Sequence, residues 1–273
     1  MKKSVFAIGL LCVLLCGCQL LNASETITLR IVDGAETGQL VLAGENAADV
    51  YTINANDVTV HLDGEKTDVS ALEDGMMAEI VCSGGIQETW PASFDTVRRI
   101  DVYSLGSVQN PAGGLYDLCG LYLQVLNDLW AKDAALNEDI TYISVDLSSA
   151  PGELTKGEQA AIAWIFASTH DATPLTLSAE QLAEEGYLTE ITGSGCGIDM
   201  ENRASNIYCW EDGVLFYIIG KTAGTEQYSL PIIQFDAGKW RSPLGAYWFG
   251  DCTAVWPEVG SWNGYTVKHE LIS

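Results

Sequence analysis

Basic residues are scarce in this sequence. Its 273 residues include 13 Lys and Arg against 37 Asp and Glu, which gives a formal net charge of −24 at pH 7. A chain of that charge is repelled by the phosphate backbone of nucleic acids, so we expect no nucleic-acid partner. Apolar residues make up 48% of the chain, which is enough to build a core and excludes a largely disordered protein.

Patterns that hold metals or cofactors are also missing. The three histidines, His61, His170 and His269, are far apart, and no Cys-x-x-Cys pair occurs, which excludes the common zinc spacings. The sequence has no acidic loop of the EF-hand type and no glycine-rich loop between a strand and a helix. We therefore expect no metal and no cofactor.

Long apolar runs are limited to the N-terminus. Lys2 and Lys3 precede eleven apolar residues, 5–15, which is shorter than the roughly 20 residues that a membrane-spanning helix needs. Residues 15–18 (Leu-Cys-Gly-Cys) resemble the bacterial lipobox. The resemblance implies that Cys18 is lipidated after removal of the signal peptide and that the lipid holds the protein at the outer face of the cell membrane. The alternative is an ordinary secretory signal. Residues 1–23 are thus expected to be a lipoprotein signal peptide and a short tether.

An exported chain can form disulfides. Beyond the lipidated cysteine, the mature sequence keeps five: Cys82, Cys119, Cys196, Cys209 and Cys252. Five is an odd number, so at least one thiol is unpaired or bonds another chain. Cys196 and Cys209 are the expected disulfide, because the polar, glycine-containing chain between them can fold back. Cys82 and Cys119 lie in apolar runs and are expected to be buried.

Residues 24–109 have the pattern of a small β-domain. Short runs of alternating apolar and polar residues end at turn residues, and Asp63-Gly64 after one run is a strong hairpin signal. Strands are predicted over residues 27–32, 40–42, 58–62, 78–82 and 97–102. This density of short strands favours a small antiparallel β-barrel, OB-like in type, because closure removes exposed strand edges.

Three segments of this domain carry a resemblance to a known family: residues 72–80, 85–92 and 97–102. In this order they resemble a small barrel-like domain of unknown function found in lipoproteins of Gram-positive bacteria. The resemblance covers residues 25–105 and implies a barrel and an envelope location, but no activity. Trp90 takes the place of an aromatic residue in the family pattern. We expect its ring to close the mouth of the barrel; the alternative is that residues 88–91 contact a ligand.

Residues 110–273 are predicted to form an α+β domain, which begins at the breaker cluster 110–114. Two of its helices are predicted to begin at Thr155 and Ser178, each with a capping-box pattern. Helices are predicted over residues 115–130, 155–165 and 178–185, and strands over 140–147, 213–219 and 228–235. Because helices come first and strands follow, we expect helices packed on an antiparallel sheet.

Aromatic residues are concentrated near the C-terminus, with seven between residues 240 and 265. One interpretation is an exposed platform on which sugars or peptides stack, where Lys239 and Arg241 meet an anionic group. The other is the core of a β-rich terminus, with Arg241 paired to an acid, and the glycines between the rings favour it. The candidate binding residues are Trp240, Arg241, Trp248, Trp256 and Trp262.

The function expected from these features is non-catalytic binding of a ligand or partner, such as an envelope protein or a glycan, at the cell envelope. One alternative is a glycan or peptide hydrolase of the envelope that uses carboxylates. Residues 117–212 hold 17 acidic residues against three basic ones, so carboxylate pairs arise by chance and no catalytic residue stands out. The other alternative is a structural envelope subunit whose acidic surface meets a basic partner.

Overall fold

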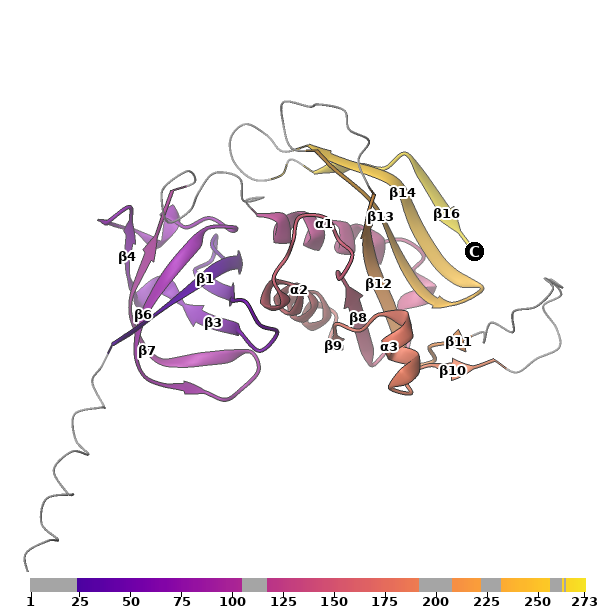
Figure 1. The fold of residues 1–273 in the computed structure, drawn as a ribbon, viewed down its shortest axis with the longest axis horizontal. Coiled ribbons are helices and arrows are strands. Elements are labelled where there is room, and N and C mark those ends of the chain that lie inside the picture. Colours follow the sequence, from indigo (N-terminus) through magenta and orange to yellow (C-terminus); the bar gives the residue numbers. More distant parts are fainter. Residues whose placement is uncertain (1–23, 105–116, 192–207, 222–231, 256–261, 263) are drawn as a thin grey trace, which may run out of the picture.

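The computed structural model describes residues 24–104, 117–191, 208–221, 232–255, 262 and 264–273. These residues form a β-barrel and an α+β unit, with two helices between the barrel and a large sheet (Figure 1). The predicted signal peptide and tether with Cys18, and the predicted domain boundary at 110–114, lie outside the described residues. No helix in the described part of the chain is long and apolar enough to cross a bilayer.

Five strands form the barrel: β1 (Glu25–Asp33), β2 (Gln39–Ala43), β3 (Val50–Asn54), β6 (Met77–Gln87) and β7 (Ala92–Val102). They pair in the order β3-β2-β1-β6-β7, and β3 also pairs with β7, which closes the cylinder. The predicted small barrel is confirmed. All neighbouring strands in it are antiparallel except the closing pair β3–β7, which is parallel.

A hairpin of β4 (Thr59–Leu62) and β5 (Glu65–Thr67) extends the sheet beside β7. Its turn residues Asp63 and Gly64 have positive φ angles of 50° and 89°, as a type I′ turn requires, which confirms the predicted hairpin. Trp90 follows β6 and is 47% exposed. The expectation that its ring closes the barrel is wrong, because the alternating apolar residues of the strands already fill the interior.

The α+β unit is built on a second sheet, in the order β15-β14-β13-β12-β8-β9, with β16 also paired to β14. Its strands are β8 (Tyr142–Asp146), β9 (Thr173–Leu175), β12 (Gly213–Gly220), β13 (Ile232–Ser242), β14 (Gly245–Val255), β15 (Tyr265–Thr266) and β16 (His269–Ile272). The expected antiparallel sheet is in fact mixed, because β8 is parallel to both of its neighbours, β9 and β12. Parallel neighbours need a crossover, and a helix between β8 and β9 supplies it.

The α-helices are α1 (Leu118–Trp130), α2 (Lys156–Thr169) and α3 (Ala179–Glu184). The capping boxes predicted at Thr155 and Ser178 are both formed, at the starts of α2 and α3. Short 3-10 helices lie at Ala55–Asp57, Val69–Ala71 and Ala134–Asn137, and β10 (Thr189–Glu190) pairs with β11 (Tyr208–Cys209) as a separate two-stranded sheet.

Helices α1 and α2 form a layer that the barrel and the large sheet share (Figure 1). One apolar cluster joins Val41 and Val50 of the barrel to both helices and to Phe216 and Phe235 of the sheet. Helix α2 suits this position because half of its buried residues are alanines, whose small side chains let it approach neighbours on more than one side. The barrel and the sheet therefore pack on the same helical layer.

The barrel and the helices approach each other closely at the start of α2. A Cβ added to Gly157 would lie 2.3 Å from the carbonyl oxygen of Gly44. Beside it, Thr155 Oγ1 donates to the same carbonyl oxygen at 2.7 Å. Arg30 of β1 donates from Nε to Oε1 of the buried Glu158 at 2.5 Å. The lack of a side chain at Gly157 thus lets α2 approach the barrel, and a hydrogen bond and an ion pair hold it there.

We predict that Gly157→Ala destabilises the protein. In an open helix this change would add roughly 1 kcal/mol of stability, but here the new methyl group meets a backbone oxygen and should cost about 1–3 kcal/mol. Urea unfolding measures the difference, with Ser168→Ala on the exposed face of α2 as the matched control. An unchanged or increased free energy of unfolding for Gly157→Ala would show that the barrel does not pack this closely on α2.

Helix α1 begins at a desolvated carboxyl group. Asp117, with a φ of 55°, is its N-cap and accepts from the Gly120 backbone N–H at 3.0 Å. Burial raises the pKa of Asp117 to about 7, and the nearby Asp74 and Asp33 add to the effect. The native state therefore binds the proton of this carboxyl group more tightly than the unfolded chain, whose ordinary pKa is 3.8.

This difference predicts that the protein loses stability as the pH rises from about 4 to about 7. In this range the Asp117 carboxyl group is already ionised in the unfolded chain but still largely protonated in the native protein. Asp117→Asn keeps the cap and the left-handed conformation without the charge. We expect the variant to be more stable than the parent at pH 7.5 by on the order of 2 kcal/mol, and equally stable near pH 4. Urea unfolding at both pH values measures this, and parallel curves for the two proteins would contradict it.

Candidate functional site

The candidate site lies on the outer face of the large sheet, opposite α1 and α2. Alternation along the strands turns Val214 and Phe216 of β12 toward the helices and Leu215 and Tyr217 toward the outer face. The register places Trp240 of β13 beside Leu215, so the indole also lies on the outer face. Since the strands are apolar on both faces, the outer face needs a cover of its own.

Helix α3 and the β10–β11 pair supply this cover over one end of the face (Figure 1). Leu182 of α3, Trp210 and Leu215 form a fully or nearly fully buried cluster there, and Trp240 packs against it. Trp210 fits because the strand beneath it has a glycine, Gly213, where a Cβ would lie 2.1 Å from the indole ring. The cover stops short of the edge, and Trp240 is only half-buried.

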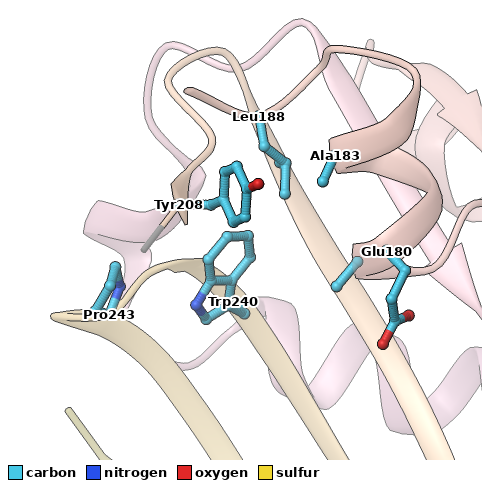
Figure 2. Close-up of a pocket in the computed structure, with 7 residues that line it drawn as sticks. Glu180, Ala183, Leu188, Tyr208, Trp240 and Pro243 are labelled. Atoms are coloured by element: carbon cyan, nitrogen blue, oxygen red, sulfur yellow. The ribbon is translucent and has the colours of Figure 1, made fainter. Parts of the chain in front are cut away.

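A pocket of about 640 Å³ opens where the cover ends. Figure 2 shows the rings of Trp240 and Tyr208 next to each other, with Leu188 above Tyr208 and Glu180 across the opening on α3. The lining residues are Ala179, Glu180, Ala183, Leu188, Tyr208, Trp240 and Pro243. Among the described residues, most of the wall is therefore apolar or aromatic, and its one charged group is a carboxylate.

The carboxylate of Glu180 is held in its ionised form. Ser178 Oγ donates to Glu180 Oε2 at 2.9 Å, and this hydrogen bond lowers the pKa of Glu180. Glu180 also lies in the first turn of α3, where unpaired backbone N–H groups favour a negative charge. The side chain is exposed, so the charge is available to a ligand in the pocket.

Arg241 fixes the wall that carries Tyr208. The backbone N–H of Trp210 donates to Arg241 O at 2.8 Å, and Arg241 Nε donates to Trp210 O at 3.2 Å. The guanidinium also donates to Glu138 O at 2.6 Å and to Glu211 O. Its donors therefore go to main-chain carbonyl groups, neither to an acidic side chain nor into the pocket, and they join β11 to β13.

Lys239 is fully buried, so the expectation that it meets an anionic ligand is wrong. Its Nζ donates to the carbonyl oxygens of Lys132 and Asp133, the latter at 3.1 Å, and to Asn137 Oδ1 at 3.1 Å. These acceptors follow the C-terminus of α1, where a cation is favoured by the helix dipole. Burial lowers the pKa of Lys239 to about 8. Lys239 thus ties the sheet to α1.

The predicted tryptophans do not form one platform. Trp248 of β14 lies on the outer face beyond the pocket, where its Nε1 donates to the Tyr217 hydroxyl and Gly238 leaves room for both rings. Trp262 is 7% exposed and belongs to the core on the helical side. Trp256 lies outside the described residues. Of the candidates that the structure describes, only Trp240 lines the pocket.

The cysteine predictions have different outcomes. Cys82 and Cys119 are buried free thiols, as predicted. Cys209 is half-buried in β11, next to Tyr208, but Cys196 lies outside the described residues, so the Cys196–Cys209 disulfide stays a prediction. Within the described part of the chain, no group of three or more His, Cys, Asp or Glu side chains is arranged to hold a metal ion.

A second, polar pocket of about 400 Å³ lies near the starts of α2 and α3. Its lining residues are Ala47, Ser148, Lys156, Gln159, Thr176, Ser178 and Gln181. Ser178 and Gln181 hold each other in a capping box, and Ser148 Oγ donates to Asp146 at 2.6 Å. The Ser178, Gln181 and Ser148 side chains already make hydrogen bonds within the protein, so part of the polar lining of this pocket is not free to bind a ligand.

No family model, no curated protein and no solved structure matches this chain. The geometry of the Trp240 pocket is therefore the observation from which a function can be inferred. Sequence patterns did not indicate Glu180, Leu188 or Tyr208, because α3 and β11 reach Trp240 only through the tertiary fold.

We predict that Arg241→Lys lowers the free energy of unfolding by about 1–3 kcal/mol. The single ammonium nitrogen of lysine cannot donate to all the carbonyl oxygens that the three guanidinium nitrogens of Arg241 reach. Arg99→Lys is the matched control, since Arg99 is exposed and pairs with Asp101 at the surface; we expect it to change stability by less than about 0.5 kcal/mol. Urea unfolding of both variants measures the effects. Equal small losses would show that Arg241 does not hold β11 in place.

Proposed function

We propose that this protein is a lipid-anchored binding protein of the cell envelope and that the pocket of Trp240, Tyr208 and Glu180 receives its ligand. The observation that carries the proposal is a half-buried indole beside a phenol ring in a pocket of about 640 Å³, on strands that α1 and α2 hold from behind. Concave, mainly apolar sites with few polar groups on a rigid support are typical of small-ligand binding.

The lining of the pocket favours binding over hydrolysis. Glycosidases generally use two carboxyl groups, one of them a general acid with a raised pKa. Among the described residues that line the pocket, Glu180 is the one acidic side chain, and its pKa is lowered. A hydrolase therefore lacks support at this site.

The rest of the proposed architecture places the pocket away from the membrane. Cys18 carries the lipid, residues 19–23 are the tether, and the barrel follows. The strand order β1-β2-β3-β7-β6 with a parallel β3–β7 pair supports an OB-like barrel. In Figure 1, α3 and β11 lie at the opposite end of the molecule from the start of β1. A ligand from the medium would thus reach the pocket freely.

We predict that Trp240→Ala weakens ligand binding at this pocket. Saturation-transfer NMR of the full chain with benzyl alcohol, benzoate, N-acetylglucosamine and choline measures it, and at least one should bind saturably. Loss of a stacking ring should weaken the bound compound by about 1–3 kcal/mol, or roughly 5- to 150-fold. Trp240→Leu keeps apolar packing without the ring and guards against a folding defect.

Trp248→Ala is the matched control, because this indole lies on the same face but outside the pocket. It should leave the affinity unchanged. The proposal fails if none of the four compounds binds, or if the affinity is the same in both Trp240 variants as in the parent protein. A stable protein complex in native membranes that is indifferent to the Trp240 variants would favour a structural envelope subunit instead.

A further inference from the structure

We propose that the ligand of the Trp240 pocket is an organic cation with an alkylated ammonium group, which sits against the faces of Trp240 and Tyr208 and opposite Glu180. This inference rests on the proposed function and names the class of ligand for the same site. Three features of the described lining lead to it: the two rings, the sign of the charge and the shortage of hydrogen-bonding groups.

The two rings provide an electron-rich wall. The π faces of tryptophan and tyrosine attract a cation within about 6 Å of the ring centre, and tryptophan does so best. Trp240 and Tyr208 come from different strands, β13 and β11, and lie next to each other in the pocket (Figure 2). Their hold on a cation is strongest where water is partly excluded, and both residues are half-buried.

Charge in the described lining of the pocket has one sign. Glu180 is the charged group of the lining, and no Lys, Arg or His among the described residues lines the pocket. The nearest cation along β13, Arg241, donates to main-chain carbonyl groups. Residues 179–190, which form α3 and lead into β10, contain four acidic residues and no lysine or arginine. The pocket therefore attracts cations and repels anions.

The shortage of polar groups distinguishes an alkylated ammonium ion from other ligands. A primary ammonium has three N–H donors to satisfy, and a sugar has several hydroxyl groups. The rest of the described wall consists of the alanine, leucine and proline side chains Ala179, Ala183, Leu188 and Pro243. Methyl groups on nitrogen need no hydrogen bonds and fit such a wall. The positive charge of the ligand is then stabilised by the two rings and one carboxylate.

Choline and 3,3-dimethyl-1-butanol test the inference, because they have nearly the same shape and differ in charge. Isothermal titration of the full chain should give choline an affinity at least about fivefold higher than that of the neutral alcohol. Choline should also bind more tightly than ethanolamine, which carries a primary ammonium. Glu180→Gln should weaken choline about fivefold and leave the neutral alcohol unchanged.

Glu185→Gln is the matched control, since Glu185 directly follows the same helix, is exposed and is not among the described residues that line the pocket. It should change neither affinity by more than about twofold. Equal binding of choline and the neutral alcohol, or no effect of Glu180→Gln on choline, would overturn the cation inference while Trp240-dependent binding still supported the proposed function. Tighter binding of ethanolamine than of choline would overturn the preference for an alkylated ammonium.

A membrane lipid headgroup and a free solute both carry this group. The remoteness of α3 from the start of β1 favours the free solute. Choline in solution should therefore bind to the pocket. Phosphatidylcholine vesicles should be retained neither by the parent protein nor by the Trp240→Leu variant. Vesicle binding that depends on Trp240 and exceeds that of choline would overturn this assignment.

Discussion

The central strands of the large sheet are apolar on both faces, and burying both faces is the constraint on which the rest of the molecule depends. Helices α1 and α2 cover one face, with Phe216 and Phe235 beneath them. On the other face α3 and β11 cover only part of the surface. The boundary of this second cover leaves Trp240 half-buried, so the pocket is a consequence of how the sheet is covered.

The same helical layer joins the two parts of the chain. The barrel packs on α2 through the contact of Gly157 with Gly44 and the Arg30–Glu158 ion pair, and the sheet holds α1 through Lys239. Because side chains from the barrel and from the sheet hold these helices on two sides, β13 is a firm base for one wall of the pocket. Arg241 extends that support to β11 and therefore to Tyr208. A binding site on such a base loses little conformational freedom when a ligand enters.

Local signals in the sequence predicted the local structure well. The capping patterns at Thr155 and Ser178 and the turn at Asp63-Gly64 depend on neighbouring residues, and all three are formed. The mixed character of the sheet was missed because it depends on β8 pairing with β12, about 70 residues away in sequence. Pairing over such a distance leaves no local pattern.

The aromatic cluster shows why the site was only partly predictable. Trp240 and Trp248 face outward, whereas Trp262 lies in the core on the helical side, so residues that are close in sequence serve different parts of the fold. The side chains of Lys239 and Arg241 donate hydrogen bonds to backbone carbonyl oxygens of other segments of the chain. Glu180 and Tyr208 complete the pocket from segments about 60 and 30 residues away from Trp240 in sequence, and only the tertiary structure brings them together.

The most direct measurement is a crystal structure of the chain grown with choline. Density for the ligand is expected between Trp240 and Tyr208, with its nitrogen within about 6 Å of a ring centre and Glu180 facing it. Choline bound only in the polar pocket beside Lys156 and Ser148, or an empty Trp240 pocket at saturating choline, would contradict the assignment of this pocket to an organic cation.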